Sequence, residues 1–173
     1  MIRKKVLIFG ASGQIGKYWI RRLVRNNFRV IAVTRNTHQK GYILKTQANP
    51  GYLDIVELNY FNIEKIENLL GRCSICINLI GILYEKKKNS FQKIHTDFPD
   101  LLSKLAAKKN IEKLIHLSSL GIEKAIDSKY AISKLEGENK IKKNFERYII
   151  LKPSIVYSVD DNFTTNFMTL LNR

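Results

Sequence analysis

A short apolar run followed directly by a glycine-rich turn opens the chain. Residues 5–9 read Lys-Val-Leu-Ile-Phe, and residues 10–16 read Gly-Ala-Ser-Gly-Gln-Ile-Gly. Apolar residues then recur at spacings of three to five, which predicts a helix that starts within the turn. A strand, a glycine turn and a helix in this order form the context in which such a glycine pattern predicts a nucleotide-binding site.

Each glycine of the turn has its own expected role. Gly10 allows the sharp turn out of the strand, Gly13 lets backbone approach a pyrophosphate, and Gly16 lets the helix lie close on the sheet. The helix N-terminus offers unpaired N–H groups to the anion. The cofactor-binding residues expected in this turn are Gly10, Ser12, Gly13, Gln14, Ile15 and Gly16.

The rest of the chain alternates between apolar runs and helical patterns. Runs rich in Val, Ile and Leu indicate a parallel sheet that is covered on both faces. Right-handed crossovers then give an α/β fold, a doubly wound parallel sheet of the Rossmann type, with ligand at the carboxyl ends of the strands. The segment 36–52 is the least regular and is expected to hold only a short helix. We expect strands at 5–9, 29–34, 53–58, 74–80, 112–118 and 147–152, and helices at about 14–26, 63–70, 91–109 and 128–144.

The length and composition favour a single globular domain. With 173 residues, 45% of them hydrophobic and 26% charged, we expect one dinucleotide-binding Rossmann domain over 1–173, with a C-terminal substrate-binding part absent or truncated. An amphipathic stretch at 163–171 follows the last expected strand. No apolar run approaches the ~20 residues that cross a bilayer, and the first strand begins close to Met1. We therefore predict no transmembrane segment and a cytoplasmic location.

The chain is strongly basic. Thirty Lys+Arg against 15 Asp+Glu give a formal charge of +15. One interpretation is attraction to nucleic acid, anionic lipid or an acidic partner, and the other is the codon usage of an AT-rich genome. The lysines are scattered and no basic stripe is interleaved with aromatic residues, so no nucleic-acid partner is expected. A peripheral membrane or assembly protein stays open as a third functional class.

The two cysteines, Cys73 and Cys76, form a nominal C-x-x-C pair. A redox pair needs a thiolate at a helix N-terminus, and zinc needs two further ligands at suitable spacing. Here the pair falls where an expected helix ends and an apolar strand begins. We interpret the cysteines as structural, with Cys76 in the core, and predict no metal site.

The end of the second strand sets the cofactor preference. In NAD-binding proteins of this kind an acidic residue near that position bonds the ribose hydroxyls. Here the sequence 29–36 carries no acid, and Arg35 stands where a 2′-phosphate would lie. A guanidinium matches a phosphate well, so NADP(H) is predicted as the preferred cofactor and NAD(H) as the alternative. The competing interpretation is a solvated arginine at a strand end.

A second polar cluster lies in the C-terminal half. Ser118 and Ser119 end an apolar run, and Tyr130 and Lys134 lie four residues apart on one face of an expected helix. The lysine charge favours the phenolate, which makes the tyrosine a usable general acid or base. A serine at the strand end can hold a substrate oxygen. The predicted catalytic residues are therefore Ser119, Tyr130 and Lys134.

With these motifs in place, the chain resembles the short-chain dehydrogenase/reductase superfamily in its extended or atypical branch. Within it, the chain is similar to the NADPH-binding accessory subunits of respiratory complex I and their bacterial relatives. The matching segments are Gly10-x-x-Gly13-x-x-Gly16, Asn78-Leu79-Ile80-Gly81-Ile82-Leu83, Leu117-Ser118-Ser119-Leu120-Gly121, Tyr130-x-x-x-Lys134 and Leu151-Lys152-Pro153-Ser154-Ile155-Val156-Tyr157 with Asp161-x-Phe163.

The resemblance implies roles at the nicotinamide end of the cofactor. It implies that Tyr130 is the acid/base, that Ser119 is its polar companion, and that Lys134 also bonds the nicotinamide ribose. It further implies that Pro153 and Ser154 approach the nicotinamide.

The resemblance also implies two roles elsewhere and shows three departures. Asn59 occupies a place near the adenine where many relatives have an acid, and Gly81 keeps the end of the fourth strand open against the cofactor. Many active relatives carry a relay asparagine in the helix after that strand. This chain has His95 there, which is either a relay substitute or a histidine of the helix surface or core. Lys152 replaces a common arginine, and Ser158 replaces a glycine.

Two classes of function follow. The first is a module that binds NADP(H) and has a structural or regulatory role in respiratory complex I or another membrane-associated assembly, at the periphery of the inner membrane. The second is an active NADP-dependent oxidoreductase or epimerase that uses the serine, tyrosine and lysine. Fold analogy does not choose between them.

Overall fold

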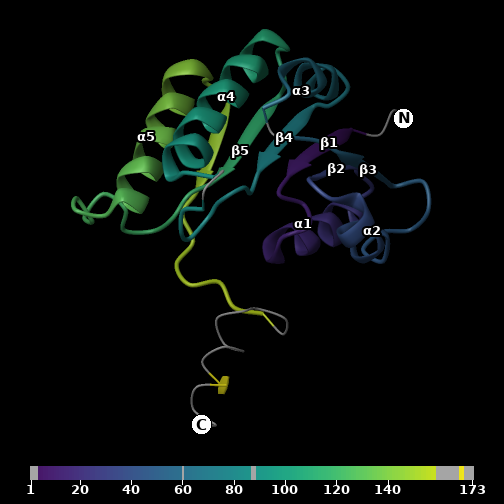
Figure 1. Cartoon of the computed structure of the whole chain (residues 1–173). Helices are drawn as coiled ribbons and strands as arrows, with labels where there is room; N and C mark the ends of the chain where they lie inside the picture. Colours follow the sequence, from purple (N-terminus) through teal and green to yellow (C-terminus); the bar gives the residue numbers. More distant parts are fainter. Residues whose placement is uncertain (1–3, 60, 87–88, 159–167, 170–173) are drawn as a thin grey trace.

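The computed structural model describes residues 4–59, 61–86, 89–158 and 168–169 (Figure 1). Within them, six strands form one parallel sheet in the order β3-β2-β1-β4-β5-β6. The strands are β1 (Lys5–Phe9), β2 (Arg29–Thr34), β3 (Leu53–Glu57), β4 (Ile75–Asn78), β5 (Lys113–Leu117) and β6 (Tyr148–Leu151). This is the doubly wound sheet expected from the sequence, and the strand order reverses between β1 and β4. Ligands of such sheets bind at that reversal.

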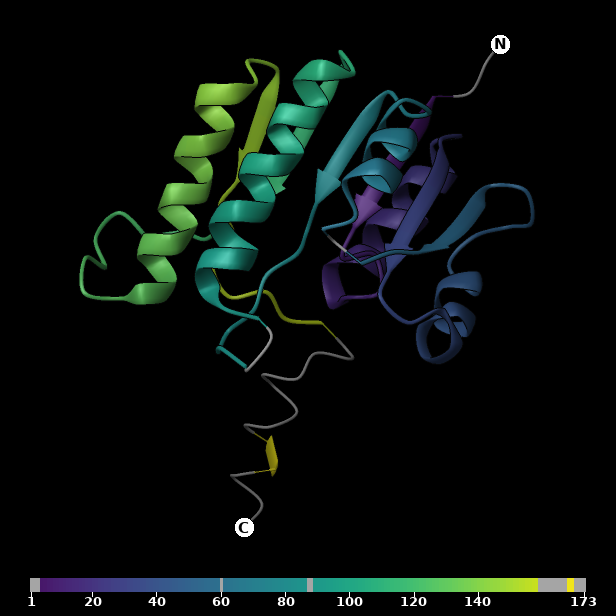
Figure 2. The same ribbon diagram turned by 45° about the horizontal axis from the view of Figure 1, so that its top comes forward.

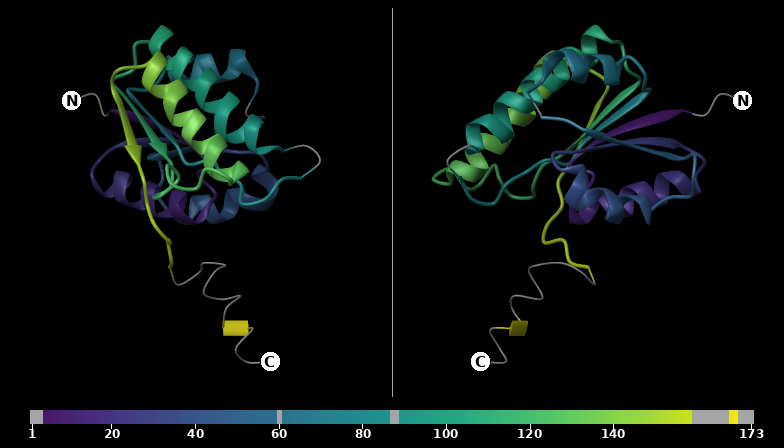
Figure 3. Two further views of the ribbon diagram at one scale, coloured as in Figure 1. Left: turned by 90° about the vertical axis from the view of Figure 1, so that its left-hand side faces the viewer. Right: turned by 45° about the vertical axis from the view of Figure 1, so that its right-hand side comes forward.

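Helices cover both faces of the sheet (Figures 1 and 2). Apolar residues of α1 and α2 pack on one face, and those of α3, α4 and α5 pack on the other. The helices are α1 (Gln14–Arg25), α2 (Thr37–Lys45), α3 (Ile63–Leu70), α4 (Phe98–Lys108) and α5 (Lys129–Asn144), with a π-helical turn, η1 (Gln92–Asp97), immediately before α4. Figure 3 shows the two helical layers on opposite sides of the sheet, as a parallel sheet requires.

Most expected elements are confirmed, with differences at their ends. β2 and β1 have the expected bounds, whereas β4 ends at Asn78 rather than at residue 80. There the Asn78 side chain accepts a hydrogen bond from the backbone N–H of Ile80 at 3.1 Å, where the chain leaves the sheet. The helix expected at 91–109 is divided into η1 and α4. The amphipathic stretch at 163–171 lies outside the described residues apart from 168–169.

The two cysteines are structural, as expected. Cys76 is fully buried in the core on β4, and Cys73 is half-buried just before that strand. Burial raises the pKa of the Cys73 thiol to about 11, so it carries no reactive thiolate near neutral pH. Among the described residues, no cluster of histidine, cysteine or acidic side chains could hold a metal ion. The helices of this part of the chain are also too short or too polar to span a bilayer.

Candidate functional site

The glycine turn at the end of β1 forms a close-fitting loop. Gly10 has φ +76°, a conformation that favours glycine, and a Cβ there would lie 3.0 Å from the carbonyl carbon of Leu79 after β4. The backbone N–H of Gly13 donates to the carbonyl of Gly10 at 3.0 Å, which closes the turn. A Cβ on Gly16 would lie 2.3 Å from the carbonyl oxygen of Ala11. Gly16 therefore packs against the turn itself, whereas the sequence suggested contact with the sheet.

Helix α1 starts directly after Gly13, which occupies its N-cap position without a capping side chain. The first turn carries no acidic residue, so its unpaired N–H groups can donate hydrogen bonds to an anion. The Thr34 hydroxyl at the end of β2 donates to the Ser12 hydroxyl at 3.4 Å and ties the turn to the neighbouring strand. The start of α1 therefore has the geometry and charge of a phosphate-binding site.

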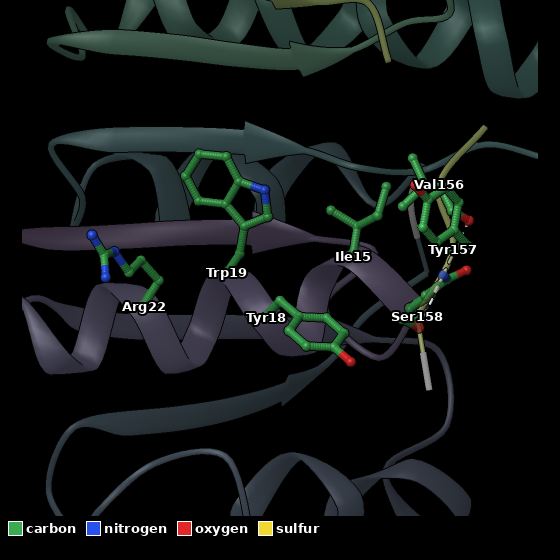
Figure 4. Close-up of a pocket in the computed structure, with 8 residues that line it drawn as sticks. Ile15, Tyr18, Trp19, Arg22, Val156, Tyr157 and Ser158 are labelled. Atoms are coloured by element: carbon green, nitrogen blue, oxygen red, sulfur yellow. Dashed lines mark hydrogen bonds between the residues drawn. The ribbon is translucent and has the colours of Figure 1, made fainter. Parts of the chain in front are cut away.

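Gln14 and Ile15 face a second feature, a cavity of about 590 Å³ along α1 (Figure 4). The Gln14 amide donates to the carbonyl of Val156 at 3.3 Å and to the hydroxyl of Ser158 at 3.1 Å. The chain after β6 is thereby fastened to the start of α1. The lining residues are Gln14, Ile15, Tyr18, Trp19, Arg22, Val156, Tyr157 and Ser158. The Gln14 side chain is directed to this segment, which leaves only its backbone for the predicted cofactor contact.

A larger cavity, of about 870 Å³, lies at the carboxyl ends of β2 and β3. Arg35 and Asn59, both predicted from the sequence, line it together. Three lysines with no site role predicted from the sequence also line it, namely Lys65, Lys86 and Lys93. They come from α3, from the loop after β4 and from η1, so only the fold brings them together. Among the described residues, its lining combines four cationic side chains with one carboxylate.

That carboxylate belongs to Glu57 at the end of β3, and it is hydrogen-bonded to another residue of the protein. It accepts hydrogen bonds from the backbone N–H of Thr37 at 2.7 Å and from the Thr37 hydroxyl at 2.5 Å. These hydrogen bonds lower the pKa of Glu57, so it stays ionised at the start of α2. Its charge therefore stabilises the N-terminus of that helix.

Tyr130 and Lys134 lie at the other end of the carboxyl edge, in the first turns of α5. Lys134 is buried, with 5% of the residue exposed, and its ammonium donates to the carbonyl of Leu117 at 3.1 Å. It also lies 5.8 Å from the centre of the Tyr130 ring. Burial lowers the pKa of Lys134 to about 8, and the negative charge of Glu138 opposes that shift. The pair is thus brought together as predicted, with a lysine that titrates closer to neutrality than a free one.

The two serines after β5 differ in accessibility. Ser118 is 3% exposed, and its hydroxyl lacks a hydrogen-bond partner among the described residues. Ser119 is half-buried, so it is the serine that a ligand can reach more readily. The backbone N–H of Leu120 donates to the carbonyl of Pro153 at 2.9 Å, which places the predicted Pro153 beside the serine loop.

The loop after β4 connects the two ends of the candidate site. Leu79 contacts Gly10, and two residues later a Cβ on Gly81 would lie 3.6 Å from the Lys134 ammonium and 3.8 Å from Nε2 of His95. Gly81 is exposed. A side chain there would contact the ammonium, so the glycine keeps the space beside it clear, and the cofactor role that the resemblance implied for Gly81 stays a prediction.

His95 is a buried core histidine, one of the two alternatives to a relay that the sequence left open. It is 2% exposed. Burial, with a contribution from the charge of Lys134, lowers the pKa of His95 to about 4. His116 on β5 is similarly buried, and burial lowers its pKa to about 3. Its Nδ1 accepts a hydrogen bond from the Asn78 amide at 3.1 Å.

These two histidines predict acid sensitivity. Both are neutral in the folded protein, whereas an imidazole in the unfolded chain binds a proton below about pH 6.5. The free energy of unfolding should therefore fall by about 1.4 kcal/mol for each histidine per pH unit, from about pH 6.5 down to pH 4. Urea denaturation between pH 7.5 and 4.5 measures this slope.

The exposed His38 on α2 provides the control for that measurement. A His38→Asn variant should keep the full slope, because it leaves His95 and His116 in place. A free energy of unfolding that stays constant from pH 7 to pH 5 would show that His95 and His116 are accessible to protons in the folded state.

The site as a whole fits a dinucleotide. The glycine turn and the start of α1 offer backbone N–H groups to a pyrophosphate, and the cationic cavity lies at one end. Exposed Gly81, with the Lys134 ammonium behind it, lies at the other end. A doubly wound sheet that carries these features at its carboxyl edge defines the class of Rossmann-type dinucleotide-binding proteins.

The chain belongs to the NAD dependent epimerase/dehydratase family, whose sequence profile matches residues 6–173. Among curated proteins it is 26% identical to the mitochondrial NADH-ubiquinone oxidoreductase 40 kDa subunit of Neurospora crassa, over 95% of this chain and 44% of that protein. It is 27% identical to the mitochondrial NADH dehydrogenase (ubiquinone) 1 alpha subcomplex subunit 9 of Mus musculus, over 92% and 42%. The chain thus spans less than half the length of these relatives. It is also 23% identical to the ceramide reductase of Caulobacter vibrioides, over 99% and 52%.

Solved structures agree with this fold. The Bordetella bronchiseptica enzyme WbmH, solved in complex with NAD+, superposes with a TM-score of 0.77 at 16% identity, over 99% of this chain and 63% of that chain. The UDP-glucuronic acid 4-epimerase of Bacillus cereus, solved in complex with NAD, gives 0.70 at 20% identity, over 88% and 57%. At these identities the likeness concerns the fold.

Proposed function

We propose that this chain binds NADP(H) in preference to NAD(H), and that holding the cofactor is its main function. The cavity at the ends of β2 and β3 carries this proposal, because Arg35 lies there with three lysines. Guanidinium and ammonium groups bind a phosphate by charge-assisted hydrogen bonds, and a ribose hydroxyl needs no such charge. Asn59 lines the same cavity and adds no negative charge that would repel a 2′-phosphate.

In this proposal, residues outside the cationic cavity bind the rest of the cofactor. The backbone of the glycine turn and the start of α1 bind the pyrophosphate, and Gly81 admits the nicotinamide half toward Lys134. A bound nicotinamide supplies hydride transfer. The chain's own residues bind and orient it, with Lys134 bonding the ribose, and Ser119 and Pro153 lying beside it.

The relatives' names favour a role within a larger assembly. Two of them are named as subunits of NADH dehydrogenases of mitochondria. We propose that this chain likewise associates with respiratory complex I or a comparable membrane-associated assembly, as a cytoplasmic protein at the periphery of the inner membrane. Comigration of the protein with that assembly in native gels, maintained at moderate salt, tests this part.

An active enzyme is the second candidate. The burial of Lys134 beside the Tyr130 ring and its hydrogen bond to the carbonyl of Leu117 support this candidate. A relative is named for a reductase activity. In this reading Tyr130 moves the proton, Lys134 stabilises the phenolate, and Ser119 holds the substrate oxygen.

Titration and turnover measurements separate the two candidates. We expect NADPH to bind more tightly than NADH in calorimetric titrations of the purified protein. Bound NADPH should then persist in the presence of quinones, ketones or sugar nucleotides. Turnover that disappears in Tyr130→Phe would instead support the enzyme, and equal affinity for both cofactors would overturn the NADP(H) preference.

A further inference from the structure

The histidine in the π-helical turn has a more specific arrangement than a core residue requires. His95 lies in η1, between the loop after β4 and helix α4. A π-turn widens the helix locally and is frequent at functional sites. In this turn His95 contacts both the loop that carries Gly81 and the helix that carries Tyr130.

Both ring nitrogens of His95 are bound to the protein. Nε2 accepts a hydrogen bond from the backbone N–H of Ile82 at 3.0 Å, so this nitrogen carries no proton. The proton therefore sits on Nδ1, which donates to the Ser133 hydroxyl at 3.0 Å. Ser133 in turn donates its own proton to the carbonyl of Tyr130 at 2.8 Å. Only the neutral Nδ1–H tautomer satisfies all three bonds.

The imidazole also fixes the orientation of the tyrosine ring. The His95 ring stacks on Phe91, with centroids 5.4 Å apart, and meets the Tyr130 ring edge-on at 5.2 Å and 87°. Phe91 meets the same tyrosine edge-on at 5.8 Å. Such edge-to-face contacts favour one ring orientation over others.

Two further contacts hold η1 against α5. The Thr96 hydroxyl donates to the carbonyl of Ser133 at 2.9 Å. One helical turn later, a Cβ on Gly137 would lie only 1.9 Å from the carbonyl oxygen of His95. The backbone of α5 therefore approaches η1 as closely as a glycine allows, which leaves the imidazole little freedom to move.

We propose that His95 is a positioning residue that joins the Gly81–Ile82 loop to helix α5 and thereby sets the place of Tyr130 and Lys134 against the nicotinamide half of the cofactor. This inference rests on the proposed cofactor function. A proton relay through His95 is disfavoured, because the group that donates to Nε2 is the backbone N–H of Ile82, which does not pass a proton on. The residue is thus neither a relay substitute nor a passive core side chain.

Three variants and two ligands test the inference. Asparagine at position 95 can replace the Nδ1–H donor, and glutamine can replace the Nε2 acceptor. We expect His95→Ala to weaken NADPH binding about tenfold, and His95→Asn and His95→Gln to recover part of that loss each. Adenosine 2′,5′-bisphosphate, which lacks the nicotinamide half, should bind all variants within about twofold of the wild type. His38→Asn is the matched histidine control.

Equal losses for both ligands, or no loss of NADPH affinity, would overturn the positioning role. Nitrogen-15 NMR of the cofactor-free wild type gives an independent readout: Nδ1–H with no titration between pH 5 and pH 9 is expected, and an Nε2–H tautomer would refute the arrangement. If the wild type binds neither ligand, the proposed cofactor function fails. In that case two NMR observations decide the role of His95. The Nδ1–H tautomer and a shift of the Tyr130 ring signals in Ser133→Ala would support it, and the absence of either would overturn it.

Discussion

Replacing Gly137 by alanine is expected to destabilise the fold by about 3 kcal/mol. The new methyl group would lie 1.9 Å from the backbone carbonyl oxygen of His95, far inside van der Waals contact. Backbone cannot rotate away as a side chain can, so α5 and η1 must separate. That separation would break the hydrogen bond between Thr96 and Ser133. Urea denaturation followed by circular dichroism measures the loss.

Gly41 provides a matched control for this substitution. It lies within helix α2, and a Cβ there would meet nothing within 4 Å. Gly41→Ala should raise the free energy of unfolding by about 0.5–1 kcal/mol, because alanine loses less backbone entropy in a helix. A Gly137→Ala protein as stable as Gly41→Ala would mean that α5 and η1 do not approach as closely as described.

Replacing Arg35 by alanine should weaken NADPH binding about ten- to hundredfold while changing NADH binding little. The guanidinium is expected to bond the 2′-phosphate, which NADH lacks. The three lysines of the same cavity keep the loss from being complete, since they still attract the phosphate. Calorimetric titration of both cofactors at one fixed salt concentration measures the ratio.

Arg29 is the control for this prediction, because it begins the strand that Arg35 follows. It is exposed at the amino end of β2, whereas Arg35 follows the carboxyl end of that strand. Arg29→Ala removes the same charge from the protein, so it should leave the NADPH to NADH ratio unchanged. Equal losses of both cofactors in Arg35→Ala would refute the assignment to the 2′-phosphate.

Much of the fold was predictable because a parallel sheet buries both faces of its strands. Such strands read as continuous apolar runs, and β1 and β2 have the bounds that those runs indicate. The π-turn was not predictable, since its pattern of apolar residues continues that of α4. It depends on contacts with α5 that are distant in sequence, above all at Gly137. Gly137 could be seen in the sequence, but a glycine within an expected helix indicates only a low helix propensity and not a contact with another helix.

The candidate site was predictable where its residues follow one another along the chain. The glycine turn and the pair of Tyr130 and Lys134 are of this kind. The cationic cavity was not, because Lys65 and Lys93 lie among many scattered lysines and nothing local marks them. His95 was left with several interpretations, since its burial and its two hydrogen bonds arise from the packing of η1 between a loop and a helix.

The cavity along α1 offers an optical readout of the neighbouring glycine turn. Trp19 is the sole tryptophan of the chain, and it lines the same cavity as Gln14, the residue that follows Gly13. Tryptophan emission overlaps the absorption of a reduced nicotinamide, so energy transfer should quench Trp19 when NADPH occupies the turn. The intrinsic fluorescence of this protein should therefore report the proposed cofactor's occupancy without a label, in the wild type and in every variant that keeps Trp19.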